Sequence, residues 1–297
     1  MSNCFNPANI LLPNDGIDME KWSVIACDQF TSQADYWDAV EKYVSDAPST
    51  LNVVFPEIYL GTTTKQENDS NSPMNGVKND KETGGKTKYA SMTDTDRIKY
   101  INTTMDTYLA DGTLKQAVTD GYVLVERTTE SGVRLGIVGL IDLDDYDFDP
   151  KKKTLIRATE GTVIARIPPR VKIREHAAIE LPHVMLLVDD PVDEQNGELC
   201  KNEPQENTAN ILAVKHGIIE SVYAIRDSLR KLYDTDLMQG GGHIRGYAIE
   251  GEVAKQVTEA FAAKQKSCGG FLFAVGDGNH SLATAKTCWE NIKKSGK

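Results

Sequence analysis

The residues with the clearest chemical potential are five consecutive ones near the C-terminal end, Gly276-Asp277-Gly278-Asn279-His280. An apolar run at 271–275 precedes them and a helical pattern follows, which predicts a strand, a tight turn and a helix. Such a turn leaves backbone N–H groups at a helix N-terminus, a common cradle for phosphate. Asp277 can hold a metal ion or act as a base, and His280 can transfer a proton or contact an anion. The pattern predicts a phosphate or catalytic site, and the alternative is a connector with an Asp cap.

Composition limits the classes of protein to which the chain can belong. The 297 residues allow one large domain or two ordinary ones, with a sizeable core in either case. The net charge of −11, from 33 basic and 44 acidic residues, disfavours a nucleic-acid partner. No apolar run reaches the roughly 18 residues of a membrane helix, so no membrane partner is expected. Five cysteines without a C-x-x-C pair, and no signal-peptide pattern, predict a reduced, cytoplasmic protein.

Apolar periodicity predicts strands and helices that alternate, with one hairpin, so the expected fold class is α+β (mixed α/β). Strands are expected at 22–30, 51–60, 122–127, 133–141, 184–188, 244–249 and 271–275, and helices at 31–44, 93–109, 168–179, 218–233 and 252–266. The polar stretch 61–92 predicts a disordered surface insertion that divides the core into 1–60 and 93–297. The acidic run 142–149 is interpreted as a solvated loop.

Four further polar residues are candidate substrate ligands. Asp28, at the end of a predicted strand, either binds a metal or substrate or caps the following turn. Arg157 and Glu160 lie between apolar runs, and Arg174 lies on the helix predicted after Pro168-Pro169. Guanidinium groups in such places line phosphate or carboxylate pockets, or they pair with surface acids. We assign no role to His243, which follows three glycines.

Several segments taken together resemble the bacterial and archaeal proteins grouped as domain of unknown function 1015. The resemblance runs from about residue 22 to the end and rests on short matches in order: 25–33, 48–51, 156–162, 170–174, 180–185, 240–242 and 276–281. Members of that family usually continue further, with His and Arg in their last part. The resemblance therefore implies that this chain is truncated at its C-terminus and that part of a site lies outside it.

The closing turn is also similar to the Asp-Gly-His-His-Arg turn of ParB/sulfiredoxin-like proteins, which include free serine kinases and nucleotide-switching partition proteins. That resemblance implies a nucleotide-binding element within a larger mixed-sheet domain, with phosphate at Gly276, Gly278, Asn279 and Ser281. It implies ATP or ADP with Mg²⁺ as cofactor and Asp277 as catalytic residue and metal ligand. His280 is the second candidate catalytic residue and is expected to contact a phosphate oxygen. Ser281 stands in place of the Arg, which removes a bidentate phosphate contact, and Lys286 is expected to reach back to the phosphate.

Two functions follow as expectations. The first is phosphoryl transfer from a nucleotide to a small hydroxyl compound, similar to a serine kinase, in which a few well-placed groups suffice. The alternative is a non-catalytic nucleotide sensor or switch, in which the ligand sets a conformation or a homodimer.

Overall fold

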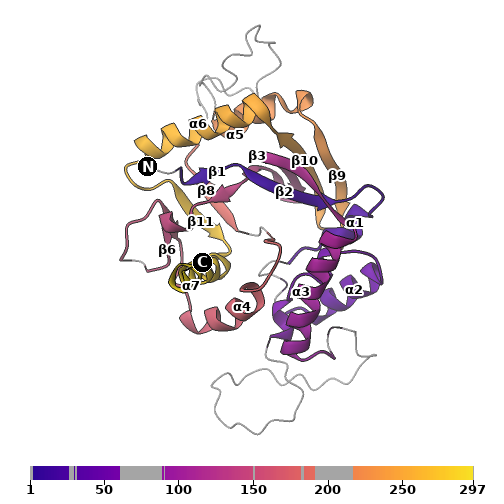
Figure 1. The fold of residues 1–297 in the computed structure, drawn as a ribbon. Coiled ribbons are helices and arrows are strands. Elements are labelled where there is room, and N and C mark those ends of the chain that lie inside the picture. The colour runs from indigo at the N-terminus through magenta and orange to yellow at the C-terminus, as the bar shows by residue number, and fades with distance from the viewer. Residues whose placement is uncertain are drawn as a thin grey trace.

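The computed structural model describes residues 3–26, 30, 32–60, 89, 91–149, 151–181, 184–190 and 217–296. Asp28 and nearly all of the polar stretch 61–92 lie outside these residues. Figure 1 shows two main sheets, helices over one face of the larger sheet, and a separate group of helices. The expected α+β class is confirmed.

The larger sheet is antiparallel, with strands in the order β2-β3-β10-β9 and with β4 paired to β3. The strands are β2 (Ala8–Pro13), β3 (Leu114–Thr129), β4 (Gly132–Val138), β9 (Lys231–Leu237) and β10 (Gly242–Ile249). Helices α5 (Ile218–Ala224) and α6 (Gly251–Ser267) cover one face (Figure 1). Tyr122, Ile249 and Val257 are fully buried in the core between them. The hairpin predicted around Gly132 is confirmed.

The smaller sheet has the order β6-β7-β11-β8. Its strands are β6 (Tyr146–Asp147), β7 (Ile156–Ala158), β8 (Met185–Val188) and β11 (Phe273–Asp277). Strand β7 is parallel to β6 and to β11, whereas β8 is antiparallel to β11. Helices α4 (Ile167–Arg174) and α7 (Asn279–Ser295) pack against each other beside this sheet (Figure 1). Because β7 and β11 are parallel, their carboxyl ends meet at one edge. The short pair β1 (Phe5–Asn6) and β5 (Leu140–Ile141) forms a third sheet.

The helical group contains α1 (Met19–Trp22), α2 (Ala34–Val44), α3 (Asp94–Ala110) and the 3₁₀ turns η2 (Thr50–Asn52) and η3 (Glu57–Tyr59). The predicted apolar face of α2 is confirmed, since it buries Tyr36, Trp37, Val40 and Val44. Thr93 caps α3 by accepting the N–H of Asp96 at 3.1 Å. Tyr89, which falls within the predicted polar insertion, is buried in this group and is part of its core. Further 3₁₀ turns are η4 (Leu143–Asp145), η5 (Ile164–Arg166) and η8 (Arg226–Ser228).

Two predicted strands in the N-terminal part are wrong. Trp22 ends helix α1, which starts at a turn where Asp18 accepts the N–H groups of Glu20 and Lys21. Residues 23–26 form no strand, and 27–29 lie outside the described residues. The run 51–60 holds the turns η2 and η3 instead of a strand. Leu51 is buried against the helical group, and a short apolar run alone does not distinguish such packing from a strand.

Three predictions in the second half also need correction. The helix expected at 218–233 stops at Ala224, and the chain then pairs with β10 as strand β9. The helix expected at 168–179 ends at Arg174. Strand β8 was expected to be buried, but Met185 and Leu187 are 42% and 53% exposed, because β8 is an edge strand that packs on only one face.

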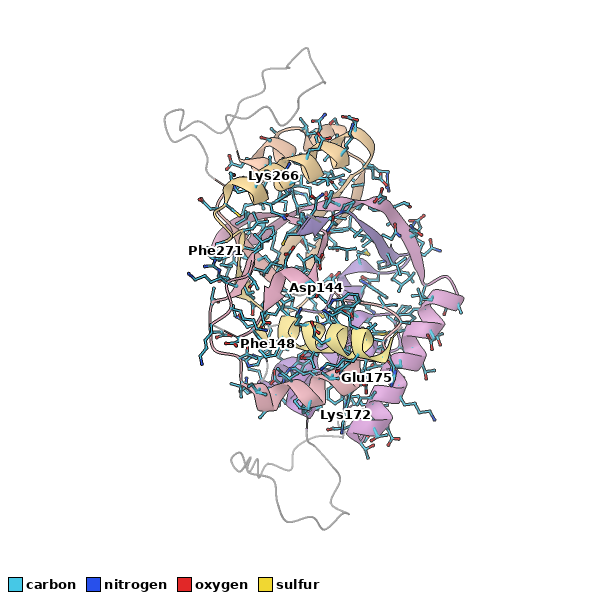
Figure 2. All side chains as sticks on the ribbon, turned by 60° about the vertical axis from the view of Figure 1, so that its left-hand side comes forward. Asp144, Phe148, Lys172, Glu175, Lys266 and Phe271 are labelled. Carbon is cyan, nitrogen blue, oxygen red and sulfur yellow. The ribbon has the colours of Figure 1, made fainter. Side chains whose placement is uncertain are left out.

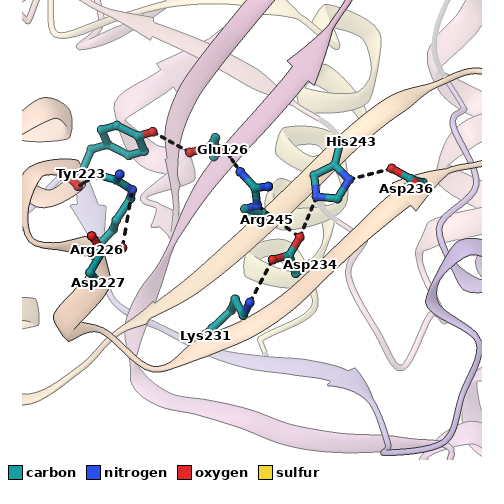
Figure 3. Close-up of polar contacts among 9 residues, drawn as sticks. All are labelled: Glu126, Tyr223, Arg226, Asp227, Lys231, Asp234, Asp236, His243 and Arg245. Atoms are coloured by element: carbon teal, nitrogen blue, oxygen red, sulfur yellow. Dashed lines mark hydrogen bonds and ion pairs between the residues drawn. The ribbon is translucent and has the colours of Figure 1, made fainter. Parts of the chain in front are cut away.

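A row of charged side chains crosses β3, β10 and β9 (Figure 3). Glu126, 6% exposed, accepts hydrogen bonds from the Tyr223 hydroxyl and from Arg245 Nη1, both at 2.7 Å. His243 lies between two carboxylates, with Nδ1 2.7 Å from Asp236 and Nε2 2.7 Å from Asp234. These carboxylates, Asp236 first, raise the pKa of His243, because both ring nitrogens donate only in the imidazolium form.

We predict that the pair of contacts at His243 makes the β9–β10 pairing pH-dependent. A raised folded-state pKa means that the stabilisation is fully present below the unfolded value near pH 6.5 and is lost as pH rises through the folded pKa. The side chains are partly exposed, so about 1 kcal/mol or less is at stake. Urea unfolding of the native chain and of His243→Gln, from pH 6 to 9, should show a stability difference that shrinks with pH. A difference that stays constant would contradict this prediction.

Candidate functional site

The strand–turn–helix expected near the C-terminal end is present. Strand β11 ends at Asp277, helix α7 begins at Asn279, and Gly278 between them has φ 87° and ψ 27°. This left-handed conformation favours glycine. Gly278 N–H donates to Asp277 Oδ1 at 2.7 Å. Within the described part of the chain no side chain caps α7, so its first-turn N–H groups are available to an acceptor such as an anion.

The loop that follows β7 lies against this turn. The Thr159 hydroxyl donates to the Val275 carbonyl at 2.5 Å, and Asn279 Nδ2 donates to Glu160 Oε1 at 3.2 Å. Val163 N–H donates to His280 Nε2 at 3.2 Å. The parallel pairing of β7 with β11 therefore brings Glu160 to Asn279 and Val163 to His280, although more than a hundred residues separate the partners in the chain.

The hydrogen bond at His280 fixes what its ring can do. Because Nε2 accepts the Val163 N–H, the neutral ring carries its proton on Nδ1. In this arrangement His280 offers an N–H donor to a ligand and has no free lone pair for proton abstraction. An anion at the turn would therefore meet a donor, which fits a phosphate contact better than a general base.

Asn279 is the most deeply buried polar group of the turn, at 3% exposure. Its Nδ2 is held by Glu160, but its Oδ1 is buried and has no hydrogen-bond partner among the described residues. An unsatisfied buried acceptor costs about 1–3 kcal/mol, so a water molecule or a ligand hydroxyl or amino group is expected to donate to it.

Arg174 brings positive charge to the first turn of α7. Helix α4, which carries Lys172 and is followed by Glu175, runs beside α7 (Figure 2), and Arg174 Nη1 donates to the Ser281 carbonyl at 3.0 Å. Its Nε and Nη2 donate to the two oxygens of Glu180, whose side chain is 64% exposed. A phosphate at the turn could compete with this exposed carboxylate for the guanidinium.

Gly276 serves packing more than ligand contact. A Cβ at this position would lie 3.0 Å from Leu187 Cγ on the neighbouring strand β8. The glycine therefore lets β8 and β11 pack closely just before the turn.

Two predicted ligands point elsewhere. Arg157 Nη2 donates to the Gly270 carbonyl at 3.0 Å, and the guanidinium lies 4.5 Å from the centre of the Phe271 ring, at the opposite end of β11. Lys286 does not reach back to the turn. Its Nζ contacts the Leu143 carbonyl at 2.9 Å and Glu290 at 2.9 Å, and it faces a pocket of about 610 Å³ between residues 144–152 and α7. Asp28 lies outside the described residues.

The acidic run 142–149 is not a simple solvated loop. Asp144, which lies over α7 in Figure 2, accepts hydrogen bonds from Lys286, Trp289 and Lys293. These donors, Lys293 first, lower the pKa of Asp144 to about 2. Tyr146 is fully buried. No local pattern predicts this role for Asp144, because its partners lie about 145 residues later.

The described residues contain no group of three His, Cys, Asp or Glu side chains placed to hold a metal ion. Within the same residues, no helix is both long and apolar enough to cross a membrane. Cys4, Cys268 and Cys288 are free thiols.

The fold and this edge define a mixed α+β protein with an open helix N-terminus at the carboxyl end of a parallel strand pair. Residues 11–297 match the family described as "Protein of unknown function (DUF1015)", and the chain belongs to that family. No curated protein and no solved structure matches the chain. The expected membership is confirmed, while the family's description gives no activity for the site.

Proposed function

We propose that this protein binds a nucleotide phosphate at the N-terminus of α7 and transfers a phosphoryl group to a small hydroxyl compound. The observation that carries the proposal is the uncapped α7 behind the left-handed Gly278, at the carboxyl edge of the β7–β11 pair. Helix N-termini favour anions through free N–H groups and the helix dipole, and ligands of open α/β sheets bind at such edges.

The residues around the turn would have separate roles in binding and transferring the phosphate. The N–H groups of Asn279, His280 and Ser281 would cradle a phosphate, and His280 Nδ1–H would donate to one of its oxygens. Arg174 would offset the charge that develops during transfer. Asn279 Oδ1, which is buried without a partner among the described residues, would accept a hydrogen bond from the ligand.

Asp277 has the central role in this proposal. One of its oxygens accepts the Gly278 N–H, which fixes the carboxylate beside the cradle. The other oxygen would receive the proton of the acceptor hydroxyl. Asp277 and Glu160 would also be the carboxylates for Mg²⁺, which in such sites is usually held by one or two carboxylates together with substrate phosphates.

A non-catalytic nucleotide switch is the second candidate, and one observation favours it. Asn279 and His280 tie the loop 159–163 to the turn through hydrogen bonds of 3.2 Å. A phosphate at the turn would compete with these contacts and would release or shift the loop. Ligand binding with loop movement but without turnover would support the switch.

A thermal-shift panel with ADP, ATP, CTP and GTP, each with and without Mg²⁺, tests the binding step. One nucleotide at about a hundred times its Kd should add roughly 2.7 kcal/mol to the free energy of unfolding.

Ser281→Asp should abolish that shift without destabilising the ligand-free protein, because a carboxylate in the first turn of α7 stabilises the helix but repels phosphate. Ser295→Asp puts the same charge at the far end of α7 and should keep the nucleotide shift. Equal shifts in both variants would place the nucleotide elsewhere.

A further inference from the structure

Arg97 is a buried charge on the apolar face of α3. It lies one and two helical turns before Ile101 and Met105, which are also buried, and only 1% of its own surface is exposed. Its two terminal nitrogens, Nη1 and Nη2, have no hydrogen-bond partner among the described residues. Four N–H donors of one guanidinium therefore lie inside the helical group without an acceptor.

Aromatic rings surround this guanidinium. Its Cζ lies 4.2 Å from the centre of the Tyr59 ring, 5.3 Å from that of Phe55 and 5.5 Å from that of Tyr89. Cation–π attraction offsets part of the cost of burying the charge, but ring faces do not satisfy in-plane N–H donors. Burial correspondingly lowers the pKa of Arg97.

Two polar side chains near the aromatic rings accept hydrogen bonds from tyrosine hydroxyls. Glu41 accepts the Tyr59 hydroxyl at 3.2 Å. Asn52 Oδ1 accepts the hydroxyls of Tyr89 and Tyr100. The carboxylates of Glu41 and Asp94 act on the Arg97 guanidinium through their charge, but neither terminal nitrogen has a hydrogen-bond acceptor among the described residues. The two terminal nitrogens of Arg97 therefore remain available to an oxygen acceptor.

We propose that Arg97 is an anion-binding residue, whose terminal nitrogens hold a small oxyanion, a phosphate or carboxylate group, between η3 and α3. The two terminal nitrogens of the planar guanidinium can donate to two oxygens of such a group, and the rings of Phe55, Tyr59 and Tyr89 hold the guanidinium plane in place. This second anion site is separate from the α7 turn and does not depend on the proposed phosphotransfer. Since Arg97 is buried, the anion enters only when the helical group opens locally, so slow exchange is expected.

The test uses the full chain labelled with ¹⁵N-arginine and titrated with inorganic phosphate or acetate, with NaCl keeping the ionic strength constant. The Arg97 side-chain N–H signals of the free protein, assigned through Arg97→Lys, should lose intensity while signals of the bound state appear at new positions, up to a saturable limit. Unchanged Arg97 signals up to concentrations at which other sites saturate would overturn the proposal. Phosphate and acetate are titrated in separate experiments, and the anion that saturates the Arg97 signals at the lower concentration is the preferred ligand.

Thermal unfolding gives an independent readout. Arg97→Met should fold, because replacing a buried ion by an apolar side chain of similar length is often neutral or stabilising. The comparison is made in the Ser281→Asp background, in which the α7 turn should no longer bind phosphate. Ser281→Asp alone should keep the part of the melting-temperature response to phosphate or acetate that belongs to Arg97, and adding Arg97→Met should weaken its apparent affinity at least tenfold. Equal responses with and without Arg97→Met would assign the anion effect to other sites, and the labelled spectra decide if Arg97→Met does not fold.

Discussion

Asp277→Ala is expected to lower nucleotide-dependent phosphoryl transfer about 10²–10⁴-fold, the range measured for losing a positioned acid or base. Its carboxylate is the acidic group fixed directly at the open end of α7, through the hydrogen bond from Gly278 N–H. The same bond is the main structural contact of the side chain, so its loss should cost only about 0.5–1.5 kcal/mol of stability. Initial rates with the nucleotide that gives the thermal shift, together with a melting curve, measure both effects.

Asp277→Asn is the matched control for that experiment. The amide oxygen can still accept the Gly278 N–H, so the turn should keep its shape, while the base and the metal-binding charge are lost. Both variants should then be equally slow, and Asn should be the more stable. Unchanged turnover in either variant would contradict the assignment of Asp277 as a catalytic residue. Nucleotide binding without turnover in the native chain would support the switch instead.

Gly242→Ala is expected to destabilise the protein by about 2–5 kcal/mol, the sum of left-handed backbone strain and overpacking. Gly242 begins β10 with φ +86°, and a Cβ there would lie 2.1 Å from the carbonyl oxygen of Thr128 on β3. The oxygen belongs to the backbone of the central strand, so it can move only if the β3–β10 pairing shifts. Urea unfolding followed by circular dichroism measures the loss.

Gly240→Ala separates the two causes. Gly240 also has a positive φ, +69°, but nothing lies within 4 Å of a Cβ added there. This variant should lose only the strain term of about 1–2 kcal/mol. Equal losses at Gly240 and Gly242 would show that the contact with Thr128 relaxes freely and that the close approach of β3 to β10 is unimportant.

Local patterns predicted the elements whose signals are strong over a few residues. The strand–turn–helix around Gly278, the hairpin at Gly132 and the apolar face of α2 follow from periodicity, turn residues and glycine alone. The α+β class follows from the order of these elements. The candidate cradle at α7 was predictable for the same reason, since a helix start and the turn before it lie within six residues.

Pairing between distant segments was not predictable in the same way. The helix predicted at 218–233 included residues 231–233, but hydrogen bonds to β10 place them in strand β9. The short runs at 22–30 and 51–60 contain buried residues whose neighbours are helices instead of strands. In each case tertiary packing outweighs local propensities worth only tenths of a kcal/mol per residue.

The sequence by itself determined the family, the class of fold and the turn at Gly276–His280, because these depend on residues close together in the chain. Only the tertiary structure decided which side chains join that turn. It brought Glu160 and Arg174 to α7, and it turned Lys286 toward Glu290 and Arg157 toward Phe271. The physical reason is that side-chain position depends on strand register and helix packing, which contacts across more than a hundred residues establish.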